Sequence, residues 1–472
     1  FDLIVVGAGS AGLPAAIFAA RRGASVLLLD HAGQLGGSLW VATGQMSAAG
    51  TRLQKERGIE DTPDLHFDDV MRISRGTANP GLVRLAVDNA AATFDWLEDE
   101  GFHALSDHPV TGYGHEPYRI PRYYWGEQGG LSIKDVLVPI VEDLARTGAI
   151  VVRLGHEVKK LVTDAEGAVI AVNARSPDGR EMIFHGSNIL LACGGYAGNP
   201  KLFERLNGYP QYNAAPYAWS QGSGLMLGKS VGGYERGAEN IFVNFGTLFE
   251  SDSFPARAIG RIEHFPERRM PWEIYVNTLG QRFVREDIES VDAREMALFL
   301  QPHYRYWIIF DDQILEESPP IVVGWSNAKL REAFARPSPT FLSAATPEEL
   351  AGKAGIDPAG LRNTILGYNY GVETGNDFFG RKHMPRPIAA SPFHAIRMQA
   401  SAVSSSVGLA VDDRLRVIRR DGTAIPNLYA AGEILGSSQT MGKAACGGMM
   451  VTPAMTFGRL LGQSLIELEQ DA

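Results

Sequence analysis

Hydrophobic residues near the start of the chain form short continuous runs separated by glycine-rich turns and one helical segment. Leu3 to Val6 is wholly aliphatic, Ala15 to Arg22 has the composition of a helix, and Ala24 to Leu29 is again mostly aliphatic. Aliphatic runs of this length are typical of strands buried on both faces of a parallel sheet. The order strand, helix, strand therefore predicts a βαβ unit of an α/β fold.

The turn between the first strand and the helix has a glycine pattern that favours binding of a dinucleotide. Gly7, Gly9 and Gly12 follow the strand with G-x-G-x-x-G spacing, and Asp30 ends the second strand. The first glycine permits a tight turn, the second lets a pyrophosphate approach the backbone, and the third lets helix and strand pack closely. The helix N-terminus supplies amide donors, and Asp30 is placed to accept hydrogen bonds from a ribose.

Two later strands end in polar turns that favour FAD over NAD. Asn188 to Asn199 runs into a glycine pair, and Ala424 to Gly436 ends at Gly432-Glu433, where a carboxylate can meet a ribityl chain. The sequence contains no second complete G-x-G-x-x-G motif with a following acid, which argues against a separate NAD(P)H domain. We therefore expect one Rossmann-like FAD-binding domain.

The C-terminal segment Gly442 to Gly462 predicts a second glycine turn that leads into a helix. Small residues and the pair Gly447-Gly448 precede a helical pattern that begins at Pro453. The N-terminus of this helix is suited to face the flavin pyrimidine ring, whose carbonyl oxygen becomes more negative on reduction.

The middle of the chain differs in composition from its two ends. From about Arg236 to Phe393 it is rich in prolines and aromatic residues and lacks glycine turns that lead into helices. We expect a discontinuous FAD-binding domain at residues 1–235 and 394–472, with an inserted α+β capping domain at 236–393 that carries part of the substrate site.

Composition excludes several classes of function. The chain has 472 residues and a net charge of −10, which disfavours non-specific nucleic-acid binding. Its two cysteines, Cys193 and Cys446, form no CxxC or Cys/His cluster, so no metal, haem or iron–sulfur site is expected. No apolar run reaches transmembrane length, and we expect a cytoplasmic location. The first strand starts at Phe1, so an upstream segment removed by processing is compatible with the sequence.

Taken together, the motifs resemble the fumarate reductase/succinate dehydrogenase flavoprotein superfamily, in the branch of flavocytochrome c fumarate reductases and 3-ketosteroid dehydrogenases. The resemblance covers nearly the whole chain. It rests on the segments VVGAGSAGLPAAIFAARRGASVLLLD, GQMSAAGT, ILLACGGYAGN, VNTLGQRFVRED, LYAAGE and TPAMTFG.

The departures from this family pattern concern substrate charge. Fumarate reductases of this type bind their two carboxylates with a histidine and an arginine and donate a proton from a second arginine. The matching positions here hold Ser404–Ser406, Ala445 and Ser290, although Arg285 and Arg294 lie near the last of these. A dicarboxylate needs cationic donors to replace its lost hydration, so the resemblance implies an uncharged substrate instead.

The resemblance also bears on the cofactor and on the substrate carbonyl. Leu39 stands where relatives that attach FAD covalently have a histidine, so noncovalent FAD is expected. Ketosteroid dehydrogenases bind the substrate ketone with a glycine amide that matches Gly448, whereas Ala444 replaces the accompanying tyrosine. The expected FAD-binding residues are Gly7, Gly9, Ser10, Ala11, Gly12, Asp30, Gly37, Ser38, Thr43, Gly44, Gln45, Met46, Val158, Ala192, Gly194, Gly432, Glu433, Gly448, Met449 and Val451.

The expected reaction is dehydrogenation at a carbon–carbon bond next to a carbonyl, or the reverse reduction, with hydride passing to flavin N5. Tyr123 or Tyr124 is the expected base, on the hypothesis that Arg119 and Arg122 lower its pKa. The residues expected to take part in catalysis are Tyr123, Tyr124, Gly448, Ser405, Arg122 and Lys443.

Three alternatives stay open at this point. The flavin could instead serve a dehydrogenase or oxidase of C–OH or C–N bonds, or a fumarate reductase-like reductase of unsaturated acids. A non-catalytic electron-transfer subunit is the third possibility. In each case a separate electron acceptor is expected, which is a quinone, a carrier protein or oxygen.

Overall fold

The computed structural model describes residues 1–465, and the chain divides into two compact units. Unit 1 comprises Phe1–Gly208, Pro216–Ile241 and the chain from Ser404 onward, whereas unit 2 comprises Tyr209–Ala215 and Phe242–Val403. Unit 1 is therefore discontinuous along the chain. The return to unit 1 lies after Val403 and not at 393/394, because the strand that starts at Phe393 belongs to the sheet of unit 2.

Unit 1 is built on a six-stranded sheet, and the strand that comes first in the sequence lies near the centre of this sheet. The order is β18 (Arg416–Ile418), β19 (Ala424–Ala430), β9 (Asn188–Leu191), β1 (Leu3–Val6), β2 (Val26–Leu29) and β5 (Ile150–Arg153). Only the β18–β19 pair is antiparallel. The carboxyl ends of β1, β2, β9 and β19 therefore meet at one edge, where α/β sheets bind their ligands.

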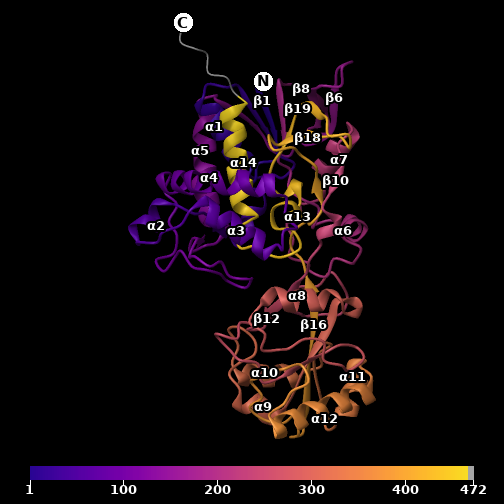
Figure 1. The fold of residues 1–472 in the computed structure, drawn as a ribbon. Coiled ribbons are helices and arrows are strands. Elements are labelled where there is room, and N and C mark those ends of the chain that lie inside the picture. The colour runs from indigo at the N-terminus through magenta and orange to yellow at the C-terminus, as the bar shows by residue number, and fades with distance from the viewer. Residues whose placement is uncertain (466–472) are drawn as a thin grey trace. The chain divides into compact units, whose positions relative to one another are not determined.

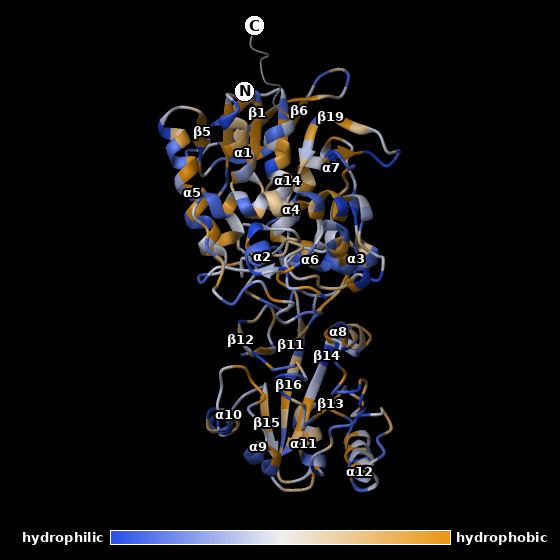
Figure 2. Ribbon diagram, turned by 60° about the vertical axis from the view of Figure 1, so that its left-hand side comes forward, coloured by the Kyte–Doolittle hydropathy of each residue, from blue (hydrophilic) through white to orange (hydrophobic). Residues whose placement is uncertain are grey.

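Unit 1 also contains helices. They are α1 (Gly12–Arg21), α2 (Arg52–Glu56), α3 (Pro63–Ile73), α4 (Pro80–Asp99), α5 (Gly130–Arg146), α6 (Pro200–Asn207), α7 (Ser223–Ser230), α13 (Ser437–Met441) and α14 (Val451–Ser464). Of these helices, α1 and α5 pack on the parallel sheet. Alternating orange and blue along α5 in Figure 2 marks an amphipathic helix, which buries Ile133, Leu137 and Val141 at four-residue spacing.

Two glycines let α14 lie directly against the backbone of α1. A Cβ on Gly458 would lie 2.0 Å from the Ala11 carbonyl oxygen, and one on Gly462 would lie 2.4 Å from that of Ala15. Because these contacts follow the same order along both helices, α1 and α14 run parallel to each other. Figure 1 shows the two helices side by side. The helix expected from Pro453 begins two residues earlier, at Val451.

Small sheets complete unit 1. A three-stranded sheet contains β6 (Glu157–Thr163), β7 (Val169–Arg175) and β8 (Glu181–His185). Two ribbons pair β3 (Met46–Ser47) with β4 (Tyr123–Tyr124) and β10 (Glu235–Arg236) with β17 (Gly408–Leu409). The first ribbon pairs Tyr124 with Met46 and Tyr123 with Ser47.

Unit 2 has the α+β composition predicted for the inserted domain. Its antiparallel sheet has the order β12 (Ala258–Arg261), β11 (Asn244–Phe249), β16 (Phe393–Ser401), β14 (Arg305–Asp311) and β13 (Ile274–Val276), and β15 (Phe341–Ala344) also pairs with β16. All nine residues of β16 are buried.

Helices accompany this sheet: α8 (Val291–Phe299), α9 (Asp312–Glu317), α10 (Asn327–Phe334), α11 (Pro347–Ala354) and α12 (Pro358–Thr374). Across residues 1–465, no helix combines the length and apolar character needed to cross a membrane.

Candidate cofactor and active site

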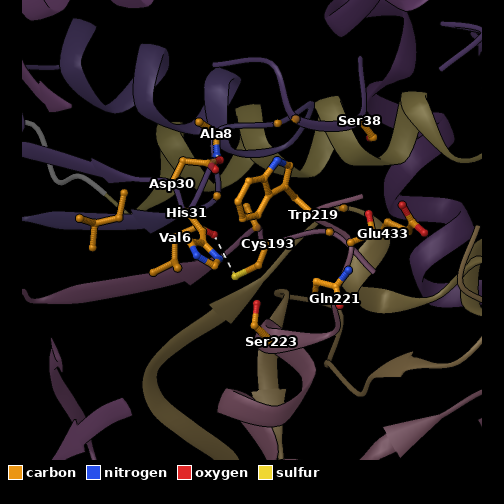
Figure 3. A pocket seen from close by; sticks show the side chains of 18 of the residues that line it. Val6, Ala8, Asp30, His31, Ser38, Cys193, Trp219, Gln221, Ser223 and Glu433 are labelled. Atoms are coloured by element: carbon orange, nitrogen blue, oxygen red, sulfur yellow. Dashed lines mark hydrogen bonds between the residues drawn. The ribbon is translucent and has the colours of Figure 1, made fainter. Parts of the chain in front are cut away.

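A cavity of about 200 Å³ in unit 1 lies at the carboxyl ends of the parallel strands. It reaches from Asp30 at the end of β2, past the first glycine turn, to Glu433 after β19. Figure 3 shows side chains from all of these segments around it. The sheet topology thus brings together residues that are more than four hundred positions apart in the sequence.

Two glycines of the first turn, Gly7 and Gly12, leave no room for a side chain. Gly7 has φ 112°, and a Cβ there would lie 2.2 Å from the Ala192 carbonyl oxygen. A Cβ on Gly12 would lie 1.8 Å from the Gly7 carbonyl oxygen. Among residues 1–465 no side chain caps the N-terminus of α1, so the partial positive charge of this helix end is available to an anionic ligand.

Asp30 closes one end of the cavity. One carboxylate oxygen accepts a hydrogen bond from the Ala8 amide at 2.7 Å, and the other accepts one from the Ala32 amide at 2.7 Å. Burial raises the pKa of Asp30 overall, although these two amides act in the opposite direction. The amides fix the carboxyl group, and each oxygen keeps a lone pair for a ligand hydroxyl.

Glu433 closes the opposite end and is held by a serine. Glu433 Oε1 accepts hydrogen bonds from the Ser405 amide and the Ser405 hydroxyl, both at 2.9 Å. The same hydroxyl oxygen accepts from the amides of Tyr196 at 2.7 Å and Ala197 at 3.1 Å. A serine hydroxyl offers one donor and two lone pairs, so Ser405 is saturated and orients Glu433 instead of facing a substrate. Burial raises the pKa of Glu433 despite the two bonds from Ser405.

Twelve of the twenty residues expected to bind FAD line this cavity. They are Gly7, Gly9, Ser10, Ala11, Asp30, Gly37, Ser38, Val158, Ala192, Gly194, Gly432 and Glu433. The donor set fits FAD: uncapped helix amides suit a pyrophosphate, and the carboxyl groups at the two ends suit ribose and ribityl hydroxyls.

The other eight expected FAD ligands lie outside the cavity lining. They are Gly12, Thr43, Gly44, Gln45, Met46, Gly448, Met449 and Val451. Gly12 has a packing role, as described above. Gly44 has φ 66° and abuts Gly129, while Met46 pairs with Tyr124 in the β3–β4 ribbon. Gly448 and Met449 lead into the N-terminus of α14, which also lacks a side-chain cap.

The two tyrosines expected to act as the base are buried, and their pKa values move in the unexpected direction. Burial raises the pKa of both Tyr123 and Tyr124 above the ordinary value for tyrosine. A hydrogen bond with the Gly448 amide partly offsets this effect at Tyr123, and the Tyr124 hydroxyl lies 2.9 Å from Thr51 Oγ1. Both hydroxyls therefore keep their protons at neutral pH.

Arg122 does not lower these pKa values because its guanidinium is committed elsewhere. It is fully buried and binds Asp61 through Nε and Nη2 at 2.9 and 2.8 Å, and Asp69 through Nη1 at 2.9 Å. Arg119 is mostly exposed and also pairs with Asp69. Arg122 thus anchors the loop that precedes Tyr123, and the sequence did not reveal its carboxylate partners.

The second glycine turn is packed tightly in unit 1. A Cβ on Gly447 would lie 2.8 Å from Cζ of Tyr123, and one on Gly448 would lie 2.3 Å from the Ser47 nitrogen. Gly448 has φ 78°, which a side chain would strain. Lys443 is half-buried, and its amide donates to Thr77 Oγ1 at 3.0 Å.

Several cavity residues were missed by the sequence reasoning. They are Val6, Ala8, Leu29, His31, His156, Cys193, Tyr217, Trp219, Ser220, Gln221, Ser223 and Leu227. His31 and Cys193 directly follow residues that were predicted, so their position after strand ends was a usable signal. Burial raises the pKa of the Cys193 thiol to about 12, and its Sγ lies 3.2 Å from the Val6 carbonyl oxygen. The segment around Trp219 carries no motif that would have identified it.

The central parallel sheet, the glycine turn and the acidic residues at both ends of the cavity define an FAD-dependent oxidoreductase fold. The chain belongs to the family described as FAD binding domain, whose model matches residues 2–449. This result confirms the expected superfamily and FAD as the cofactor.

Individual relatives match over nearly the whole chain. A probable fumarate reductase, Ifc3, from Shewanella frigidimarina is 28% identical over 98% of this chain and 74% of its own length. Among solved structures, the open conformation of a flavocytochrome c3 fumarate reductase is 26% identical, with a TM-score of 0.72, over 98% of this chain and 78% of that one. The 3-ketosteroid-Δ4-(5α)-dehydrogenase from Rhodococcus jostii RHA1, solved with 4-androstene-3,17-dione, is 25% identical, with a TM-score of 0.71, over 98% and 96% of the two chains.

Proposed function

We propose that this chain is an FAD-dependent oxidoreductase that acts on a carbon–carbon bond next to a carbonyl group in an uncharged substrate. The observation that carries the proposal is the loss of cations where fumarate reductases hold carboxylates. Ser405 has no hydrogen-bonding capacity left, and Ala445 offers no donor in its side chain. A dicarboxylate would therefore find no cationic side chain at these positions to offset its lost hydration.

The arginines nearest to Ser290 do not compensate for this loss. Ser290 caps α8, and its hydroxyl accepts a hydrogen bond from the Ala293 amide at 3.2 Å. Arg294 is buried and donates to main-chain carbonyls, including that of Ile288 at 2.7 Å, while Arg285 pairs with Asp287 at 3.3 Å. Both arginines thus have partners within unit 2.

FAD, when bound, accepts or supplies the hydride. We propose that the chain contributes hydrogen-bond donors for the substrate carbonyl. The Gly448 amide polarises the Tyr123 hydroxyl, which keeps its proton because burial raises its pKa, and this hydroxyl donates to the carbonyl oxygen as negative charge develops. One such donor contributes about 3 kcal/mol to transition-state stabilisation. Dehydrogenation also removes a proton from the carbon next to the carbonyl, and the reverse reduction returns one. Lys443 and Tyr124 are the candidates for this proton transfer.

We also propose that FAD is held without a covalent bond. Leu39, at the position of the attaching histidine in relatives, is buried and has no nucleophilic atom. Electrons then pass between the flavin and a separate electron acceptor or donor, which is a quinone, a carrier protein or oxygen. The solved ketosteroid dehydrogenase, whose ligand is an uncharged diketone, supports the substrate class.

A second candidate is the reduction of an unsaturated acid, because the related Shewanella protein is described as a probable fumarate reductase. The two candidates predict opposite preferences for charge. The test is to mix the FAD-loaded protein with a saturated cyclic ketone, and the chemically reduced protein with either a cyclic enone or fumarate, while following flavin absorbance.

We expect the ketone to bleach the flavin and the enone to restore its colour, and we expect fumarate to react slowly. Tyr123→Phe should lower the rate with enone about a hundredfold, and Tyr209→Phe, in unit 2, is the matched control. Rapid turnover of fumarate without turnover of enones would refute the proposal. Bleaching only by alcohols or amines would instead favour a C–OH or C–N dehydrogenase. A flavin that no small molecule reduces or reoxidises would favour an electron-transfer subunit.

A further inference from the structure

Trp219 is a large apolar side chain that the fold leaves partly open. It is 45% exposed, and it lines the cavity that begins at the first glycine turn. In Figure 3 its indole extends into the space between Asp30 and Gln221. Leaving an indole in water costs favourable burial, so an indole that faces a ligand cavity indicates a surface for a flat apolar partner.

The segment that carries Trp219 is fixed by hydrogen bonds to the turn after β9. The Gly198 amide donates to the Ser220 carbonyl at 2.9 Å, and the Gly222 amide donates to the Gly195 carbonyl at 2.9 Å. The Gln221 side chain donates to the Gly198 carbonyl at 3.0 Å. These bonds fix the backbone that carries the indole beside the cavity.

His31 lies beside Trp219 at the β2 end of the cavity. The two ring centroids are 4.7 Å apart and the ring planes make an angle of 66°. His31 directly follows Asp30, whose carboxyl group is the candidate ribose ligand. The aromatic pair therefore lies beside Asp30, at the expected adenosine end of the cavity.

We propose that Trp219 stacks on the adenine ring of FAD and that His31 borders the same subsite. Stacking of a base on an aromatic side chain is worth about 1–3 kcal/mol, which corresponds to a change in affinity of roughly 5- to 150-fold. Because FMN lacks the adenosine group, this contact selects FAD over FMN. The inference depends on FAD binding at this cavity and not on the substrate proposed above.

The test compares Trp219→Ala and Trp219→Phe with the unaltered full-length protein after removal of FAD. FAD and FMN binding are measured from flavin fluorescence, and ADP binding from its competition with FAD. We expect Trp219→Ala to weaken FAD and ADP by the same factor, within 5- to 150-fold, and to leave FMN unchanged, whereas Trp219→Phe keeps FAD affinity within a fewfold. Trp325→Ala, in unit 2 beside Lys329, is the matched control.

Two results would overturn the proposal. One is unchanged binding of both FAD and ADP by Trp219→Ala. The other is equal weakening of FAD and FMN, which would place the effect away from adenine. Circular dichroism shows whether Trp219→Ala folds. If it does not, the proposal is tested by comparing the ADP affinity of Trp219→Phe with that of Trp219→Leu, and only the phenylalanine variant should keep the affinity of the unaltered protein. No substrate is used, so failure here is distinguishable from failure of the proposed reaction.

Discussion

Replacement of Ser405 by alanine tests the reasoning that this residue is structural and supports Glu433. The hydroxyl joins three partners, which are the amides of Tyr196 and Ala197 and the carboxyl group of Glu433. Without it, two buried amide donors lose this acceptor. Each unsatisfied group costs about 1–3 kcal/mol, so the free energy of unfolding should fall by about 2–6 kcal/mol.

The assay is equilibrium unfolding of the FAD-free protein in urea, followed by circular dichroism. Ser406→Ala is the matched control, because the neighbouring Ser406 accepts from Ser438 through its main-chain carbonyl and not through its hydroxyl. We expect the control to lose less than about 1 kcal/mol. FAD affinity should also fall in Ser405→Ala, since Glu433 is no longer oriented.

A different pattern would refute this reasoning. If Ser405 instead binds a substrate, Ser405→Ala should unfold like Ser406→Ala and bind FAD normally, while KM for the substrate rises. Equal stability of the two variants would therefore contradict the saturated hydrogen bonding described for Ser405.

Three further predictions concern other buried groups. Gly7→Ala should abolish FAD binding, measured by fluorescence titration, because the new Cβ would meet the Ala192 carbonyl oxygen. The control is Gly23→Ala, at a position with φ 86° and open space around it, which should still bind FAD. Its free energy of unfolding in urea should fall by only about 1–2 kcal/mol. Arg122→Met should lower the free energy of unfolding in urea by about 3–5 kcal/mol, since the buried carboxylates of Asp61 and Asp69 lose their partner. Removal of the exposed Arg146 side chain should be nearly neutral in the same assay. Burial raises the folded pKa of Glu433, so its contribution to stability falls as pH rises from the unfolded pKa through the folded one, with a limiting slope of about 1.4 kcal/mol per pH unit. Glu433→Gln should flatten that slope in urea unfolding at pH values above the ordinary glutamate pKa.

The βαβ unit and the ligand edge could be predicted because both depend on local patterns. The aliphatic run of β1, the glycine turn and Asp30 lie within thirty residues, and each has a conformational reason to be there. Glu433 was predicted from the strand that precedes it. For these residues, sequence spacing and parallel pairing are enough to define their common edge.

The remaining site residues depend on contacts that spacing does not encode. Arg122 was expected to tune a tyrosine, but Asp61 and Asp69, from a distant segment, neutralise it. Ser405 was expected to meet a substrate, and only the folded chain brings it to Glu433. Trp219 was missed because its role depends on the tertiary position of a loop without a motif.

The packing of α14 on α1 sets a fixed offset between two helix N-termini. Gly458 lies level with Ala11, and seven residues of α14 precede it, so at 1.5 Å per residue α14 starts about 10 Å before that level. Both helices point the same way and both ends are uncapped, so two partial positive charges lie on one side of the molecule at a set spacing. Enlarging Gly458 or Gly462 would push the two helices apart and change this spacing before it touched any ligand.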